Sequence, residues 1–202
     1  MTYMSGLIVR ASDTNRLVAD LESFGREAFQ EAGATNLWVT QNVMAGEGAG
    51  EIGIACDWET VDAAVKAPDD MRAEPRFVEA MQAAGIQTLR RSLLIINAER
   101  GTLDGEFGSM IVSAGAPADQ ATMDASADAI WGHMEKGANG IRWGQGIAAG
   151  ALTGMYITIS TTDSLDDLMA ASNEMFADPQ ILTMMGEQGF QLIQRAMFRR
   201  LA

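Results

Sequence analysis

The sequence predicts an α+β protein in which one βαββαβ unit occurs twice in tandem. Two observations lead to this prediction. A long segment of the second half aligns without gaps on a segment of the first half. Short apolar runs typical of strands alternate with apolar stripes at helical spacing, in the same order in both halves. We therefore expect two similar units, each close to the usual size of a small domain.

The internal repeat is clearest in the second part of each copy. The segment that starts at Gly50 aligns on the segment that starts at Gly154, an offset of 104 residues. The matched identical pairs are Asp62 and Asp166, Met71 and Met175, Pro75 and Pro179, Met81 and Met185, Gly85 and Gly189, and Arg91 and Arg195. Further upstream we expect the alignment to drift by one residue where a loop changes length, which sets Trp38 against Trp143.

The first copy begins with an apolar run that predicts a strand, followed by a helix whose apolar positions recur at a period of 3.6. A glycine-rich turn between two apolar runs predicts a β-hairpin. Thr60 is placed to cap a second helix, which is interrupted between Pro68 and Pro75 and ends at Gly85. The expected elements are strand 6–10, helix 15–32, strands 37–44 and 51–58, a helix up to residue 85 and strand 87–96.

The second copy repeats this order. Its expected elements are strand 109–113, helix 120–136, strands 141–147 and 155–160, helix 164–189 and strand 191–201. The order βαββαβ gives a four-stranded antiparallel sheet with both helices on one face, which is the ferredoxin-like fold. The expected domains are repeat 1 at residues 5–98, a linker at 99–107 and repeat 2 at 108–202.

The sheet face without helices also needs a cover. The hairpin strands 51–56 and 155–160 carry apolar or small residues on both alternating sets, so neither face is designed for water. The simplest cover for each open face is the other copy. We therefore expect the two sheets to pack face to face as a single-chain pseudo-dimer.

Two segments, AEPRFVEAMQAAG and ADPQILTMMGEQG, resemble the Asp/Glu-Pro helix start of the dimeric α/β-barrel superfamily. The resemblance extends over both halves through the order of the elements. It implies two ferredoxin-like units whose sheets pair around a central cavity. Members of the superfamily include cofactor-free monooxygenases, haem-degrading enzymes, chlorite-dismutase-like haem proteins, small-molecule isomerases and proteins without known activity.

Composition excludes several classes of function. A net charge of −13 leaves no basic stripe for nucleic acid or anionic lipid. The absence of a long apolar stretch and of a secretory signal predicts a cytoplasmic protein without membrane contact. A single cysteine, Cys56, and a single histidine, His133, exclude an internal disulfide and any metal site built on several thiolates or imidazoles. We expect no metal and no cofactor, and we expect Cys56 to be a buried small hydrophobic residue.

A glycine motif, GAGEIG at Gly48 to Gly53, fits the spacing of a dinucleotide-binding loop. That loop must follow a strand and open a helix, whereas this one lies in a turn and enters a strand. The glycines are therefore interpreted as hairpin residues.

Tryptophans on the second strand of each copy are candidates for the lining of the cavity. Side chains alternate along a strand, so Asn42 shares a face with Trp38, and Gln145 shares a face with Trp143. If that face borders the cavity, these four side chains are ligand-binding candidates. Ordinary packing between the sheets is the alternative interpretation.

Arg90 and Arg91 are neighbours on the last strand of the first copy, so one of them faces the open side of the sheet. Arg90 is the ligand-binding candidate because its counterpart is Gln194, and it would hold a carboxylate or enolate. Pairing with an acidic neighbour is the alternative. Tyr156 is the remaining candidate, as a phenolic donor.

His133, near the end of a helix, is interpreted as a structural residue, with a haem-ligand role as the alternative. Haem-degrading members of the superfamily carry an asparagine on the first strand, and this sequence has none there.

The function expected from these observations is binding or conversion of a small apolar or aromatic carbonyl metabolite in the inter-sheet cavity, like that of a cofactor-free monooxygenase or an isomerase. A non-catalytic domain pair that binds a protein partner is the first alternative, and haem binding is the second. Catalytic residues are not assigned. The fused repeats are compatible with a monomer or a homodimer.

Overall fold

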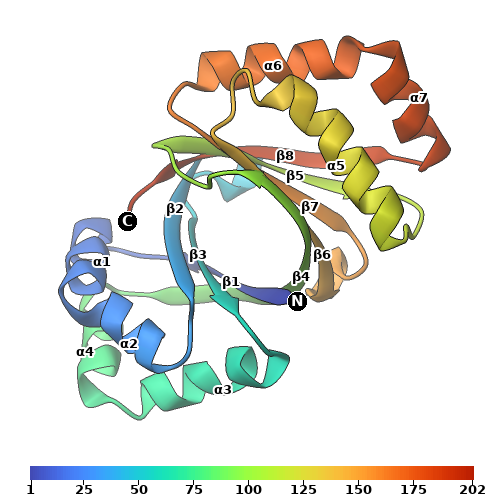
Figure 1. The fold of residues 1–202 in the computed structure, drawn as a ribbon. Helices are drawn as coiled ribbons and strands as arrows, with labels where there is room; N and C mark the ends of the chain where they lie inside the picture. The colour runs from blue at the N-terminus through green and yellow to red at the C-terminus, as the bar shows by residue number, and fades with distance from the viewer. The chain divides into compact units, whose positions relative to one another are not determined.

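The structure is a computed structural model that describes all 202 residues and divides into two compact units. Unit 1 comprises Met1–Ile95 together with Ile147–Ala149 and Arg200–Ala202. Unit 2 comprises Ile96–Gly146 and Gly150–Arg199. In each unit, helices cover one face of an antiparallel sheet (Figure 1). The predicted α+β class and the two ferredoxin-like repeats are confirmed.

The sheet of unit 1 has the strand order expected for a ferredoxin-like fold. The order is β4-β1-β3-β2, with β1 and β2 both antiparallel to β3. The strands are β1 (Thr2–Arg10), β2 (Asn36–Met44), β3 (Ile52–Trp58) and the first part of β4 (Gln87–Gly101). The end of the chain extends this sheet, because the Leu201 N–H donates to the Val39 carbonyl over 2.7 Å and the Val39 N–H donates to the Ala202 carbonyl over 3.0 Å.

The helices of unit 1 follow the sequence signals closely. The elements are α1 (Thr14–Asp20), the π-helical turn η1 (Leu21–Gly25), α2 (Arg26–Glu31), the 3₁₀ turn η2 (Gly46–Gly48), α3 (Val61–Arg72) and α4 (Pro75–Ala83). The Thr60 hydroxyl accepts from the Ala63 N–H and caps α3, as predicted. Gly85 ends α4 with a φ of +61°, a left-handed conformation that favours glycine. The π-helical turn inside the first helix was not predicted.

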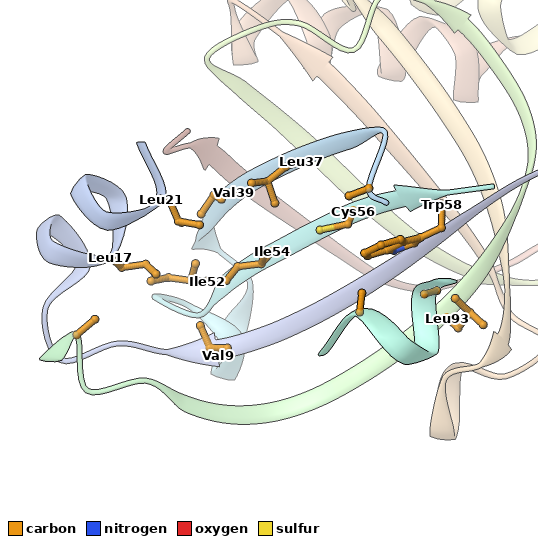
Figure 2. Packing of buried hydrophobic residues seen from close by; sticks show 14 residues of the cluster. Val9, Leu17, Leu21, Leu37, Val39, Ile52, Ile54, Cys56, Trp58 and Leu93 are labelled. Atoms are coloured by element: carbon orange, nitrogen blue, oxygen red, sulfur yellow. The ribbon is translucent and has the colours of Figure 1, made fainter. Parts of the chain in front are cut away.

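The core of unit 1 lies between its sheet and its helices. Figure 2 shows Ile52, Ile54, Cys56 and Trp58 in a row along β3. Leu17 and the other helix residues of the same cluster pack against this row (Figure 2). Alternate residues of each strand therefore face the helices.

Unit 2 repeats the arrangement with the strand order β8-β5-β7-β6. Its strands are β5 (Phe107–Ala114), β6 (Gly140–Ala148), β7 (Tyr156–Thr162) and β8 (Gln191–Arg200). Its helices are α5 (Gln120–Met134), α6 (Leu165–Ala177) and α7 (Pro179–Glu187), with a 3₁₀ turn η3 (Gly150–Leu152) in the hairpin. The end of β4 lies beside β6 and runs to Gly101, into the segment predicted as a linker.

The predicted drift of the alignment is wrong. Leu7 pairs with Ile54 in unit 1, and Ile111 pairs with Thr158 in unit 2, so the offset of 104 residues also holds in the first strands. Between its first two strands, the second copy has a shorter helix with longer loops on both sides of it, and these differences cancel.

At this offset of 104 residues, the two tryptophans of the second strands are not equivalent, because Trp38 and Trp143 lie 105 residues apart. Trp38 pairs with Ala55, whereas Trp143 pairs with Thr158, the counterpart of Ile54. Trp143 therefore corresponds to Val39, and Trp38 corresponds to Arg142. Because a shift of one residue moves a side chain to the other face, Trp143 faces the helices of unit 2 and Trp38 faces away from those of unit 1.

A cavity in unit 1 as the candidate functional site

A cavity of about 410 Å³ lies between the sheet and the helices of unit 1. Strands β1, β3 and β4 form its floor, and residues of α1, η1, α3 and α4 form its roof. The cavity predicted from the sequence lies elsewhere, between the two sheets, and stays a prediction. The cavity of unit 1 has the size of a typical small-molecule site.

Small residues on the helices keep this space open. Ala64 on α3 and Ala80 on α4 line the cavity, and their counterparts in the second copy are Leu168 and Met184. Leu168 is fully buried, and Met184 packs against the same apolar cluster. The corresponding space in unit 2 is accordingly only about 90 Å³. The two copies thus share a fold but differ in whether the space under the helices is filled.

The π-helical turn borders the cavity. Leu21, Phe24 and Gly25 all line it, and a Cβ atom on Gly25 would lie 2.9 Å from the Leu21 Cδ2 atom. Single π-helical turns occur frequently at functional sites because they re-aim side chains within a helix. The second copy has an uninterrupted α-helix at this place. The turn therefore belongs to the copy that carries the cavity.

Two polar groups on the floor satisfy each other. The Trp58 indole Nε1–H donates to the Ser5 hydroxyl over 2.8 Å. This bond fixes the indole of a buried tryptophan against the cavity. The sequence did not single out Trp58, whose counterpart in the second copy is Thr162 and not a tryptophan. The signal that could have found it is the alternation along β3, which places Trp58 on the helix face with Ile54 and Cys56.

Cys56 also lines the cavity, as a protonated thiol. Burial, with a smaller contribution from the charge of Asp57, raises the pKa of the Cys56 thiol to about 12. A thiolate is the reactive form of cysteine, so Cys56 is not a nucleophile at neutral pH. The predicted buried, apolar character of Cys56 is confirmed.

The raised pKa of Cys56 predicts an alkaline loss of stability. The unfolded chain releases the thiol proton near pH 9, whereas the folded chain keeps it up to about pH 12, so stability that is fully present below pH 9 is lost as the pH rises through this range. The loss should approach about 1.4 kcal/mol per pH unit. Urea unfolding of the wild type and Cys56→Ala at pH 8 and pH 10.5 checks it. A constant difference between the two proteins would contradict the prediction.

Charged residues at the cavity are mainly cationic. Arg72 and Arg91 line it, together with one carboxylate, Asp20. The Arg16 Nε–H donates to an Asp20 carboxylate oxygen over 2.7 Å, so this carboxylate already has a partner. Arg72 is likewise paired with Asp69, so Arg91 is the charged lining residue without an internal partner, and it favours an anionic group on a bound molecule.

Arg90 has an internal partner. The Arg90 Nη2–H donates to the Glu51 Oε2 atom over 3.2 Å, and Arg10 lies 3.7 Å from the other oxygen of this buried carboxylate. Of the two neighbouring arginines on β4, it is Arg91 that lines the cavity of unit 1.

Asn42 and Gln145 stabilise the hairpins. The Asn42 side chain donates to the Gly48 carbonyl over 3.3 Å, and the Gln145 side chain donates to the Gly154 carbonyl over 3.2 Å. Gln41, the counterpart of Gln145, makes the same contact with Gly50. A ligand-binding role for these residues stays a prediction.

The structure brings together Trp143 and Tyr156, which line the small pocket of unit 2. The Tyr156 hydroxyl donates to the Ala116 carbonyl over 3.1 Å. Trp38 is half-buried on the sheet face away from the helices and does not line the cavity of unit 1. Binding roles for these three residues also stay predictions.

His133 lies 3.2 Å from an Asp178 carboxylate oxygen, between α5 and α7, and lines neither pocket. No group of three His, Cys, Asp or Glu side chains is placed to hold a metal ion. The residues around the two pockets therefore do not fit a haem with a histidine axial ligand.

Comparison with known proteins identifies the fold. No family model and no curated protein matches the chain. Among solved structures, chlorite dismutase from Candidatus Nitrospira defluvii is 9% identical with a TM-score of 0.57, over 99% of this chain and 92% of that one. An anthrone oxidase-like protein is 13% identical with a TM-score of 0.55, over 98% and 91%. The chain shares the fold of these two proteins.

A third structure, a proposed monooxygenase from Lactobacillus acidophilus, is 11% identical with a TM-score of 0.54, over 100% of this chain and 95% of that one. These matches extend over nearly the whole chain, as expected from the order of the elements in both halves. At such identities they show the fold alone. No helix in the structure has both the length and the apolar character needed to cross a membrane.

Proposed function

We propose that the chain binds a small aromatic carbonyl compound in the cavity of unit 1. The observation that carries this proposal is the pair of alanines, Ala64 and Ala80, which leave about 410 Å³ open where the second copy places larger side chains. An unfilled apolar space of this size lowers the stability of the fold through lost packing contacts. Its presence in only one of the two copies therefore indicates that it binds a ligand.

Conversion of the bound compound is the second part of the proposal. The fold is shared with an anthrone oxidase-like protein and a proposed monooxygenase. A guanidinium at the wall of an apolar cavity stabilises an enolate, the form in which an aromatic ketone reacts with oxygen without a cofactor. Anthrone and O₂ would give anthraquinone and water. Oxygen uptake with anthrone should therefore exceed the uncatalysed rate.

The test fills the cavity of unit 1 by replacing its two alanines with the larger residue types found at the same positions in the second copy. In the double variant Ala64→Leu/Ala80→Met, we expect affinity for the probe 2-naphthamide, measured by calorimetry, to fall by about tenfold or more because the added side chains occupy the site. Anthrone-dependent oxygen uptake should fall in parallel.

Ala83→Met provides the matched control, because Ala83 lies on the same helix but is exposed. This variant should bind as the wild type does. Equal affinity for 2-naphthamide in the wild type and the double variant would disprove the proposed site, and so would a wild type that binds neither 2-naphthamide nor its carboxylate analogue 2-naphthoate.

A further inference from the structure

Arg91 and Arg195 occupy matched positions on β4 and β8 but have different surroundings. In unit 2, the Arg195 Nε–H donates to the Ser109 hydroxyl over 3.0 Å, and its Nη1–H donates to the Ser172 hydroxyl over 3.2 Å. The guanidinium of Arg195 is thus held between the sheet and α6 by two hydroxyl groups of its own chain.

In unit 1, Arg91 has no equivalent of these two hydroxyl partners. The counterpart of Ser172 is Pro68, which has no hydroxyl. The counterpart of Ser109 is Ser5, whose hydroxyl accepts the indole N–H of Trp58. The side chain of Arg91 has no hydrogen bond or ion pair with another residue. The two changes, at Pro68 and Trp58, thus remove the internal partners of an arginine that lines the open cavity.

The carboxylates nearby do not replace these partners. Asp20, the one carboxylate that lines the cavity, is paired with Arg16. Glu51 is paired with Arg90, the neighbour of Arg91 along β4. A guanidinium presents a planar fork of donors that fits a carboxylate in a bidentate manner. The geometry therefore leaves Arg91 free to bind a carboxylate from outside the chain.

We infer that the ligand of the unit 1 cavity carries a carboxylate, which Arg91 binds while the apolar body of the ligand lies against Trp58 and Ile54. This inference rests on the proposed function and narrows the ligand class to aromatic carbonyl compounds that carry a carboxylate. The second copy, with its arginine satisfied internally and its space filled, would not bind the same compound.

The test compares two probes of nearly equal shape, 2-naphthoate and its neutral analogue 2-naphthamide, by calorimetry on the full chain. We expect the wild type to bind 2-naphthoate about tenfold or more tightly than 2-naphthamide, because hydrogen bonds to a charged group contribute more free energy than those to a neutral group. Arg91→Gln should lose this preference but keep the affinity for the amide. Arg91→Lys should keep part of it, since a lysine retains the charge without the planar fork.

Arg90→Gln is the matched control, because it removes the neighbouring positive charge without touching the cavity. It should retain the preference for the naphthoate. A preference that survives in Arg91→Gln, or equal binding of both probes to the wild type, would overturn the role of Arg91 and leave the proposed function standing. Binding of neither probe would instead disprove the proposed function itself.

Discussion

Leu168→Ala should lower the free energy of unfolding by about 2–5 kcal/mol, the range for a buried leucine whose removal leaves a cavity. Leu168 has no exposed surface and lies on α6 in the apolar cluster of unit 2. The same substitution restores the residue type of the first copy, Ala64, and should enlarge the pocket of unit 2 beyond its present 90 Å³. Urea unfolding monitored by circular dichroism measures the loss.

Leu182→Ala is the control for this variant, since Leu182 is about half exposed on the neighbouring helix α7. Its effect should stay within about 0.5 kcal/mol. Calorimetry with 2-naphthamide should show a second, weaker binding event in Leu168→Ala, because an apolar cavity of sufficient size takes up apolar ligands. If Leu168→Ala lowered the free energy of unfolding by less than about 1 kcal/mol, neighbouring side chains would have repacked into the space, and Leu168 would not be what keeps the pocket of unit 2 small.

Gly137→Ala should lower the free energy of unfolding by about 1–3 kcal/mol, nearly as much as Leu168→Ala. A Cβ atom at Gly137 would lie 2.2 Å from the Asp167 carbonyl oxygen, which belongs to the backbone of α6 and cannot rotate away. The Thr162 hydroxyl donates to the Gly137 carbonyl over 2.7 Å and holds the segment in place. Thermal and urea unfolding should both register the loss.

Gly132→Ala is the contrasting case within the same part of unit 2. Gly132 lies exposed on α5, and a Cβ atom there would meet nothing within 4 Å. Alanine should stabilise the helix by about 0.5–1 kcal/mol. If Gly137→Ala and Gly132→Ala changed stability in the same direction, the close approach of α6 to Gly137 would not hold in solution.

The order of elements could be predicted because each copy repeats the same local signals. The cap at Thr60 and the stop at Gly85 lie where the sequence placed them, whereas α3 continues through Pro68 to Arg72 and breaks only just before Pro75. Each of these signals acts within a few residues, which is why they can be read without knowledge of tertiary contacts. The π-helical turn at Leu21–Gly25 has no such local signal and was missed.

Matching tryptophan with tryptophan in the two copies did not predict which face of the sheet each side chain lies on. Aligning Trp38 with Trp143 introduced a shift of one residue, and in a strand such a shift reverses the face. The pairing of Trp38 with Ala55 and of Trp143 with Thr158 corrects it. Apolar residues on both sets of positions gave the sequence no clean alternation from which to detect the error.

The sequence does, by contrast, contain a signal for the cavity of unit 1, in the residue pairs that differ in size between the two copies. At the offset that the repeat itself defines, Ala64 and Ala80 stand against Leu168 and Met184. Differences in side-chain volume between two copies of one fold indicate where one copy is less filled than the other. What the sequence could not supply is the direction in which Arg91 points, since that depends on which face of β4 meets the helices.

Segments far from the first repeat complete unit 1. Leu201 and Ala202 bond to Val39, and Ile147–Ala149 also belong to unit 1. During translation, the N-terminal half therefore leaves the ribosome well before its last hydrogen-bonding partners are made, and it must wait in an incomplete state. Pairing that spans such a long stretch of chain is also slow to form, because the entropy of closing the loop is lost before the contacts are made.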